Sequence, residues 1–262
     1  MAHNEVKSEL RGAVLIVTFN RPDRGNALTP DVANQLFNIL KPATTDRGIR
    51  AVVLQGEGGN FMDGLDMKLF AGDFNTALEH YNQMFQPYHS AIRELYVMDK
   101  PVIAACDGTT SGPGFSIMMA CDFVLAARGA KFNTKYASYA MTPDGGCSFA
   151  LARKAGAGKA MELLMLSETF GAAEGEKCNL VNAVTEDGKV HEEATKWAER
   201  LANGPTRAYA GIKKLVGKAF EQDINTHLAL EHSYWGASSR SFDFREALRA
   251  MTANRAVRFT GT

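Results

Sequence analysis

The chain has 262 residues, 45% of them hydrophobic and 22% charged, which is enough to bury one large core, or a core with a small helical appendage. Its 29 basic and 29 acidic residues give a formal net charge of +0, which argues against nucleic acid or an anionic membrane surface as the main partner. No apolar run approaches the roughly 20 residues of a membrane span. The N-terminal segment MAHNEVKSEL also lacks the apolar stretch of a secretory signal.

The cysteines indicate a reducing compartment. Cys106, Cys121, Cys147 and Cys178 are widely spaced in apolar segments and form no CxxC pair. Such a pattern is typical of reduced thiols and disfavours a zinc site. The sequence therefore predicts a cytoplasmic protein without a metal centre.

The first half of the chain alternates apolar strands with helices. Strands are predicted at residues 14–19 and 51–55, and Thr29-Pro30-Asp31 marks the start of a helix that runs to about Leu40. Two strands joined by a helix of this length predict a right-handed βαβ unit and a parallel sheet. A second, longer helix is predicted from about Phe74 to Val97.

The segment from Lys100 to Asp122 is the one around which the chain is organised. It reads as a buried strand at 101–106, a turn rich in glycine, and a buried helix at 115–121. A glycine-rich turn that opens a helix brings unpaired main-chain N–H groups together, and such groups can hold an anion or a developing oxyanion. The competing interpretation is a close strand-to-helix crossover in which glycine only permits tight packing.

The second half of the chain becomes increasingly helical. A strand is predicted at 122–127, a short one at 131–133, and the turn 142–146 precedes a helix from about Cys147 to Lys154. Beyond Gly158 the expected helices are 159–166, 172–178, 187–202, 206–220, 222–238 and 241–253. The sequence thus predicts an α/β core over residues 1–200 and a helical region over 201–262.

Several motifs follow one another in a fixed order along the chain. They are NRPxxxNAL, FxxGxD, KPVIAAxxGxxxGxG, MxxCD, a PDGG turn and a C-terminal FxxAxxxxxxxRxxRFTG. In this order they resemble the enoyl-CoA hydratase/isomerase family, the crotonase superfamily, over roughly residues 10–260. The resemblance implies a spiral of ββα units and a C-terminal helical region that assembles trimers or dimers of trimers. It also implies an acyl-CoA thioester as substrate, with no separate cofactor.

In this family two main-chain N–H groups hold the thioester oxygen and stabilise the enolate. The resemblance implies the N–H of Asp63 as the first donor, and we expect its unusual acidic side chain to point away from the thioester. The second donor corresponds to Pro113, which has no N–H to give. Either the N–H of Gly114 or Gly112 takes over, or the oxyanion hole has one donor, at a cost of about 10²–10³ in rate.

The acid and base positions of the family also differ here. The two glutamates of its hydratases correspond to Ser116 and Tyr136, which disfavours water addition. Asp144, in the PDGG turn, is the remaining carboxylate, and in related isomerases a single acid at this turn moves a proton between two carbons. A role as a helix-capping or turn acid is the competing interpretation. We expect apolar neighbours to raise the pKa of Asp144, namely Tyr139, Met141 and Phe149.

Two alternatives to an isomerase remain open. The 4-chlorobenzoyl-CoA dehalogenase branch also places an aspartate at this turn as a nucleophile, with a histidine about 55 positions earlier that activates water. His89 stands at the matching place, and its competing interpretation is a polar residue on a long helix. Tyr136 replaces the tryptophan of that branch. Pro113 argues against dehalogenation, because that reaction depends on a strong oxyanion hole. The second alternative is a CoA-binding member of the family without activity.

The resemblance finally implies contacts to CoA. Arg24 corresponds to a residue that meets the CoA phosphates, and Ala27 lies beside it. The adenine and pantetheine path is expected to be bordered by Met62, Leu65 and Asp66. Trp235 corresponds to an aromatic residue that closes the pocket, from this subunit or a neighbour. The competing interpretations are a solvated loop charge for Arg24 and core packing for Trp235.

Overall fold

The computed structural model describes residues 4–69, 71 and 73–262. Its strands form a six-stranded sheet of order β1-β2-β3-β5-β7-β10 and a four-stranded sheet of order β4-β6-β8-β9. Only the pairs β1 with β2 and β8 with β9 are antiparallel. The strands are β1 (Val6–Arg11), β2 (Val14–Phe19), β3 (Ala51–Gly56), β4 (Met62–Asp63), β5 (Val102–Cys106), β6 (Thr109–Ser111), β7 (Phe123–Ala127), β8 (Lys131–Asn133), β9 (Phe170–Gly171) and β10 (Ala183–Thr185).

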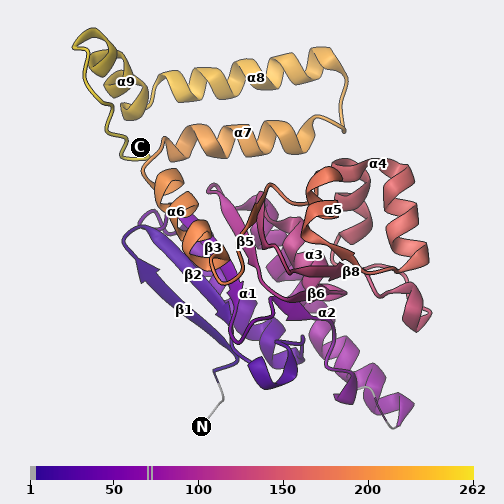
Figure 1. The fold of residues 1–262 in the computed structure, drawn as a ribbon. Helices are drawn as coiled ribbons and strands as arrows, with labels where there is room; N and C mark the ends of the chain where they lie inside the picture. Colours follow the sequence, from indigo (N-terminus) through magenta and orange to yellow (C-terminus); the bar gives the residue numbers. More distant parts are fainter. Residues whose placement is uncertain (1–3, 70, 72) are drawn as a thin grey trace.

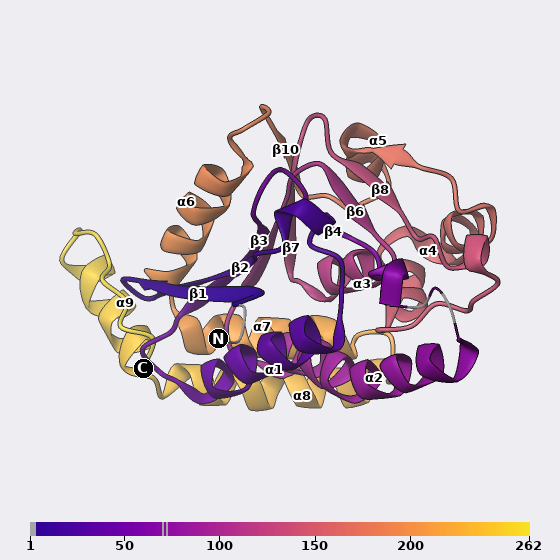
Figure 2. The same ribbon diagram turned by 90° about the horizontal axis from the view of Figure 1, so that it is seen from below.

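The helices surround these sheets and extend beyond them. They are α1 (Pro30–Thr45), α2 (Phe74–Val97), α3 (Pro113–Ala120), α4 (Cys147–Leu166), α5 (Ala172–Lys177), α6 (Val190–Ala202), α7 (Thr206–Lys218), α8 (Ile224–Ser239) and α9 (Phe242–Thr252). Short 3₁₀ turns lie at η1 (Pro22–Arg24), η2 (Met67–Leu69) and η3 (Ala137–Tyr139). Helices α1 and α2 pack side by side (Figure 2), and α6 packs against β3 and β5. Helices α7 and α8 form an antiparallel pair above this body (Figure 1).

The core lies where sequence patterning places it. Strands β2, β3 and β5 are buried along nearly their whole length, as expected for parallel strands covered on both faces. The predicted βαβ unit is confirmed, since β2 and β3 pair in parallel on either side of α1. Thr29 caps α1 by accepting a hydrogen bond from the Val32 N–H. The helix continues past the predicted end at Leu40 because Ala43 extends its buried face. Within the described residues, no helix is both long and apolar enough to cross a bilayer.

The short or polar strands escaped prediction. β1 is exposed at every residue but Val6, so its sequence lacks the alternation that marks a half-buried strand. β4, β6, β9 and β10 have only two or three residues each. The two helices predicted at 147–154 and 159–166 form one element, α4, interrupted at Gly156, where φ is 81°. The division at residue 200 falls within α6 and stays a prediction.

Asn26 joins two loops that follow β2 and β3. Its side chain is buried, and its backbone has a left-handed φ of 58°. The amide nitrogen donates to the carbonyls of Glu57 and Asn60 at 2.9 and 2.7 Å, and the amide oxygen accepts from the Arg21 N–H at 2.8 Å. The side chain therefore sets the position of the loop that follows β3.

We expect Asn26→Ala to destabilise the fold, because three main-chain groups lose the buried Asn26 amide as their partner, at a cost of up to roughly 1–3 kcal/mol each. Urea unfolding should show a total loss of about 2–4 kcal/mol, since some of these groups will find water. The matched control is Asn34→Ala, at an exposed position of α1 where the amide bonds only the Pro30 carbonyl. Equal stability of both variants would contradict the structural role of Asn26.

Candidate active site

A cavity of about 680 Å³ opens where the loop after β4, helix α2, the start of α3 and the turn before α4 meet. It is lined by both polar and aromatic side chains, with the apolar part contributed mainly by α2 and the loop after η3. Five of the six predicted catalytic residues line it, namely Asp63, His89, Pro113, Tyr136 and Asp144. Gly114 is outside the lining.

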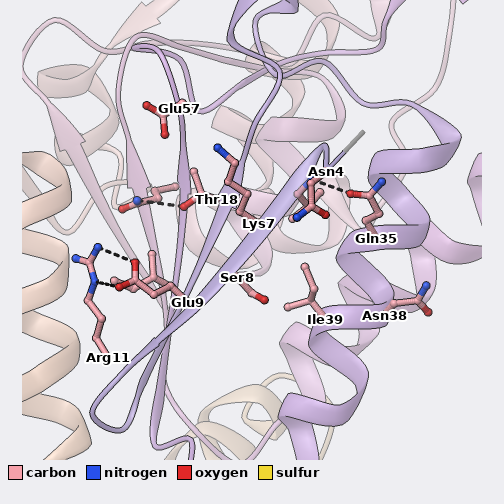
Figure 3. Close-up of a pocket in the computed structure, with 13 residues that line it drawn as sticks. Asn4, Lys7, Ser8, Glu9, Arg11, Thr18, Gln35, Asn38, Ile39 and Glu57 are labelled. Atoms are coloured by element: carbon pink, nitrogen blue, oxygen red, sulfur yellow. Dashed lines mark hydrogen bonds and ion pairs between the residues drawn. The ribbon is translucent and has the colours of Figure 1, made fainter. Parts of the chain in front are cut away.

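A second hollow, of about 630 Å³, lies between β1 and α1 (Figure 3). Charged and polar side chains line most of it, and Arg11 pairs with Glu9 at 2.8 Å within it. It contains none of the predicted catalytic residues. The chemistry therefore belongs to the first cavity.

Asp144 is a largely buried carboxyl held by phenols. The Tyr136 hydroxyl donates to Asp144 Oδ1 at 2.7 Å, and the Tyr88 hydroxyl reaches the same oxygen at 3.4 Å. Burial raises the pKa of Asp144, while these hydrogen bonds and the nearby His89 partly oppose that shift. The direction agrees with the sequence prediction.

The neighbours that cause this shift differ from those predicted. Phe149 is 45% exposed and packs its ring against the Arg153 guanidinium, 3.4 Å from the ring centroid, outside the cavity. Tyr139 and Met141 do line the cavity but are about half exposed. The prediction that Phe149 surrounds Asp144 is therefore wrong, because position 149 on α4 faces away from the turn.

Hydroxyl groups occupy the two places that correspond to the hydratase glutamates. The Ser116 hydroxyl lies 2.7 Å from that of Tyr136 and donates to the Asp144 carbonyl at 3.1 Å. Burial raises the pKa of Tyr136 far above its ordinary value, so its hydroxyl stays protonated and acts as a donor. The pair positions Asp144 and brings no second negative charge.

His89 lies on α2 against the same turn. Its ring stacks on that of Phe85 with centroids 3.9 Å apart, and its Nε2 accepts a hydrogen bond from the Gly145 N–H at 3.3 Å. The Nε2 atom of His89 is thus already in contact with a main-chain donor.

The first predicted oxyanion donor is replaced by a neighbour. The Asp63 N–H donates to the Gly25 carbonyl at 2.8 Å, so it cannot hold a thioester oxygen in this conformation. Leu65 forms a parallel bridge with Leu28, whose N–H and carbonyl bond Gly64 and Asp66 at 2.8 and 3.0 Å. In such a bridge the N–H of Leu65 points away from Leu28, and it has no acceptor among the described residues. Leu65 lines the cavity, so the prediction for Asp63 is corrected to Leu65.

The start of α3 offers no equivalent second donor. Pro113 lines the cavity without an N–H, and the Gly112 N–H donates to the Asn133 carbonyl at 3.1 Å. Gly114 packs so closely against Met62 that a Cβ there would overlap the Met62 carbonyl. Of the alternatives left open by the sequence, Gly112 is excluded and Gly114 lies outside the cavity lining.

Asp63 still takes part in the site, through its side chain. Its Oδ1 accepts hydrogen bonds from the Ser111 hydroxyl and the Lys135 ammonium, each at 2.7 Å. Partial burial would raise the pKa of Asp63, but these two partners lower it overall. Asp63 lines the cavity, and the charge of its carboxylate is paired with Lys135. Sequence reasoning missed Lys135, because the pairing depends on how separate strands are aligned.

The predicted CoA contacts on the loop after β4 divide into two groups. Leu65 lines the cavity, whereas Met62 is completely buried beneath α3 and cannot contact a ligand, which corrects that prediction. Asp66 is engaged in an ion pair with Arg21 at 2.9 Å. A structural role therefore accounts for both Met62 and Asp66.

The remaining predicted CoA contacts lie outside the cavity of a single chain. Arg24 has a partly exposed side chain, 4.0 Å from that of Asp23, and Ala27 is buried with its carbonyl bound by Arg21. Trp235, on α8, is 68% exposed and stacks edge-on with Phe244. Core packing is therefore excluded for Trp235.

No metal site accompanies these residues. Across the described part of the chain, no group of three or more His, Cys, Asp or Glu side chains is placed to hold an ion. The functional groups of the cavity lining include two carboxyls, hydroxyls, an imidazole and an ammonium.

Comparison with known proteins identifies the family of the chain. The family model described as enoyl-CoA hydratase/isomerase matches residues 9–262. The chain is 31% identical to 1,2-epoxyphenylacetyl-CoA isomerase of Escherichia coli, over 98% of both chains. It is 29% identical to the short-chain-enoyl-CoA hydratase of Clostridium acetobutylicum, again over 98% of both.

Solved structures show the same architecture. An enoyl-CoA hydratase from Polaromonas sp. JS666 superposes with a TM-score of 0.91 at 33% identity, covering 97% of this chain and 99% of that one. An enoyl-CoA hydratase from Bacillus anthracis gives a TM-score of 0.92 at 26% identity, covering 98% and 100%. The α/β spiral of the crotonase fold expected from the sequence is thereby confirmed. The chain belongs to the enoyl-CoA hydratase/isomerase family.

Proposed function

We propose that the protein is an acyl-CoA isomerase that moves a double bond of an enoyl-CoA by proton transfer through Asp144. The observation that carries the proposal is a single unpaired carboxyl in the cavity, largely buried and with a raised pKa. The other carboxyl of the lining, Asp63, is neutralised by Lys135. One carboxyl suffices for isomerisation, because the proton it removes from one carbon is returned to another.

The geometry assigns a task to each group. The thioester oxygen is held by the Leu65 N–H, and Asp144 removes a proton from the carbon chain to give an enolate. The phenols of Tyr88 and Tyr136 both bond Oδ1, which leaves Oδ2 free of side-chain donors among the described residues. We assign proton transfer to Oδ2. Reprotonation of the distal carbon by the same carboxyl regenerates Asp144 and completes the shift.

The hydratases among the relatives do not make hydration the better proposal. Water addition requires a group that activates water while another protonates carbon, and the family positions for this pair carry Ser116 and Tyr136. Both are neutral, and both hydroxyls already donate to residue 144, Ser116 to its carbonyl and Tyr136 to its carboxyl. The site therefore favours proton transfer without water.

The dehalogenase-like alternative receives less support. It requires His89 as a base, but the Nε2 of His89 accepts the Gly145 N–H. It also requires strong polarisation of the thioester to draw charge from an aromatic ring, while Pro113 removes a donor from the cavity. We expect no halide release from 4-halobenzoyl-CoA.

The wall formed by α2 suits an apolar, unsaturated acyl group. The rings of Tyr81, Phe85 and His89 follow one another along the helix, with centroids 5.6 and 3.9 Å apart, and all three line the cavity. Aromatic side chains bind flat, polarisable groups well. In the proposed complex, an acyl chain packed along these rings carries its double bond near the Asp144 carboxyl.

CoA recognition and assembly complete the proposal. Arg24 lies on a loop with a partly exposed guanidinium that could meet a CoA phosphate, next to the loop of Leu65. Large apolar side chains are exposed along α7–α9, among them Val216, Phe220, Ile224, Trp235 and Met251. Such a surface is typical of a subunit contact, and we propose a homotrimer or a dimer of trimers, in which Trp235 meets a neighbouring subunit.

Asp144→Asn should abolish isomerisation of 3-enoyl-CoA, with a loss of at least about 10³-fold in kcat, because the amide cannot accept the proton. Absorbance of the conjugated product measures the rate. Asp31→Asn, an exposed acid in the first turn of α1, is the matched control and should retain activity. Isomerisation that survives in Asp144→Asn would rule out the proposed relay.

Urea unfolding should show whether Asp144→Asn loses activity without losing its fold. The pKa of Asp144 is raised in the folded state, so the folded protein binds this proton more tightly than the unfolded chain does. Ionisation therefore costs stability as the pH rises through the window between the unfolded and the raised folded value. At pH 7 we expect Asp144→Asn to unfold at the same urea concentration as wild type or a higher one.

The pH dependence of kcat/KM should show an acid limb set by Asp144. Activity requires the carboxylate, so kcat/KM falls as the pH drops through the raised pKa, above the ordinary aspartate range. Tyr136→Phe removes a hydrogen bond that lowers this pKa, so the limb should move to higher pH. Tyr139→Phe, which has no bond to Asp144, should leave the position of the limb unchanged. A limb that stays fixed in Tyr136→Phe would argue against Asp144 as the base.

A further inference from the structure

We propose that the ammonium of Lys135 takes the place of the main-chain donor that Pro113 cannot provide, and stabilises the thioester oxygen as the enolate forms. This inference rests on the proposed proton transfer through Asp144. It assigns a catalytic role to a residue in the loop after β8 whose side chain is paired with Asp63.

The register of the small sheet brings Lys135 to the same side of the cavity as Leu65 and Pro113. Asp63 on β4 is aligned with Ser111 on β6, and Ser111 with Asn133 on β8. All three strands run in parallel and end near this row. Counting two residues beyond the row on each strand reaches Leu65, Pro113 and Lys135, and all three line the cavity. Lys135 thus comes from the third of three adjacent strand ends, beside the one donor that is present and the one that is missing.

The side chain of Lys135 is fixed between those two segments. Its Nζ donates to Asp63 Oδ1 at 2.7 Å, and the same oxygen accepts from Ser111 at 2.7 Å. Asp63 lies two residues before Leu65, and Ser111 lies two residues before Pro113. Because an ammonium has three N–H donors and this one has Asp63 as its partner among the described residues, two remain for a substrate oxygen.

The backbone at Lys135 is held in an uncommon conformation. Its φ is 56°, in the left-handed region that lysine rarely adopts, and its N–H donates to Asn133 Oδ1 at 2.6 Å. The next residue, Tyr136, directs its hydroxyl to Asp144. In the proposal, two consecutive residues therefore act on different groups: Lys135 on the thioester oxygen and Tyr136 on the base, Asp144.

Charge explains why Asp63 accompanies Lys135. A carboxylate alone beside the thioester would oppose enolate formation, and an ammonium alone would be free to move. Paired, Asp63 and Lys135 add no net charge to the cavity before reaction, and two N–H groups of the ammonium have no partner among the described residues. As the negative charge develops on the thioester oxygen, these donors stabilise the enolate more than the ground state, as catalysis requires.

The first test is kinetic. Lys135→Met should lower kcat for 3-enoyl-CoA by about 10²-fold with little change in KM, the loss typical of one oxyanion donor. Lys135→Arg keeps the charge and should recover at least about tenfold of that loss. Lys131→Met, an exposed lysine on β8 outside the cavity, is the matched control. A rise in KM with unchanged kcat would show that Lys135 only binds CoA, and would overturn the inference.

A double-mutant cycle tests the replacement itself. Pro113→Gly restores an N–H at the start of α3, so in that background the effect of Lys135→Met should shrink to less than about tenfold. An equal loss in both backgrounds would show that Lys135 and the missing donor are unrelated. The cycle remains informative if Lys135→Met alone is destabilised, because Pro113→Gly does not restore the Asp63 ion pair.

A readout without turnover separates this inference from the proposed function. Acetoacetyl-CoA bound to the protein ionises to an enolate that absorbs in the near ultraviolet, whether or not 3-enoyl-CoA is a substrate. Lys135→Met should raise the pKa of the bound ligand by about two pH units, the equivalent of a 10²-fold loss. If Lys135→Met leaves the pKa of bound acetoacetyl-CoA unchanged, the role of Lys135 is overturned. If that pKa rises but the wild-type protein does not isomerise 3-enoyl-CoA, the role of Lys135 stands and the isomerase proposal is rejected.

Discussion

The site depends on a balance at one carboxyl group, Asp144. Burial disfavours its ionised form, while hydroxyls from α2 and from the turn after β8 stabilise that form. Without the hydroxyls the pKa of Asp144 would rise further, and without burial it would fall towards the ordinary aspartate value. The proposed proton transfer between two carbons relies on this balance.

The parallel sheet explains why the groups of the site meet. The loops after β2 and β3 are joined by Asn26, and the bridge between Leu28 and Leu65 turns the N–H of Leu65, a residue of the cavity lining, away from Leu28. In the small sheet, β4, β6 and β8 end in one row. Loops at the carboxyl ends of parallel strands lie together, so segments distant in sequence share one cavity. The position of each hydrogen-bond donor in the cavity is therefore set by strand register more than by the local sequence around it.

That dependence on register also sets what the sequence could predict. The buried strands and the helix α2 carry strong local signals, and the order of the motifs indicated the crotonase fold. Asp144 and Pro113, which the motifs singled out, both line the cavity. The assignment of the first donor to Asp63 failed because which N–H faces the cavity depends on the bridge to Leu28, and no local pattern shows that bridge. Lys135 was missed for the same reason.

Errors of burial have a different cause. Met62 stands in a loop motif and was expected at the ligand, yet it lies beneath α3 because Gly114 allows close approach there. Phe149 was placed near Asp144 by distance in sequence, but the side chains of a helix point in different directions, and this one packs on Arg153. Local patterns indicate which residues are apolar, while the packing of neighbouring elements decides which surface they cover.

The replacement of glutamate by Tyr136 is coupled to the presence of Asp144. The Tyr136 hydroxyl lies 2.7 Å from the Asp144 carboxyl, so a glutamate at 136 would bring a second carboxyl close to the first. Two such groups share a proton and titrate together, and neither then behaves as an independent base. A neutral phenol avoids this conflict and donates a hydrogen bond to the Asp144 carboxyl. In the proposed isomerisation, positions 116 and 136 therefore supply hydroxyls that bond residue 144, in place of further carboxylates.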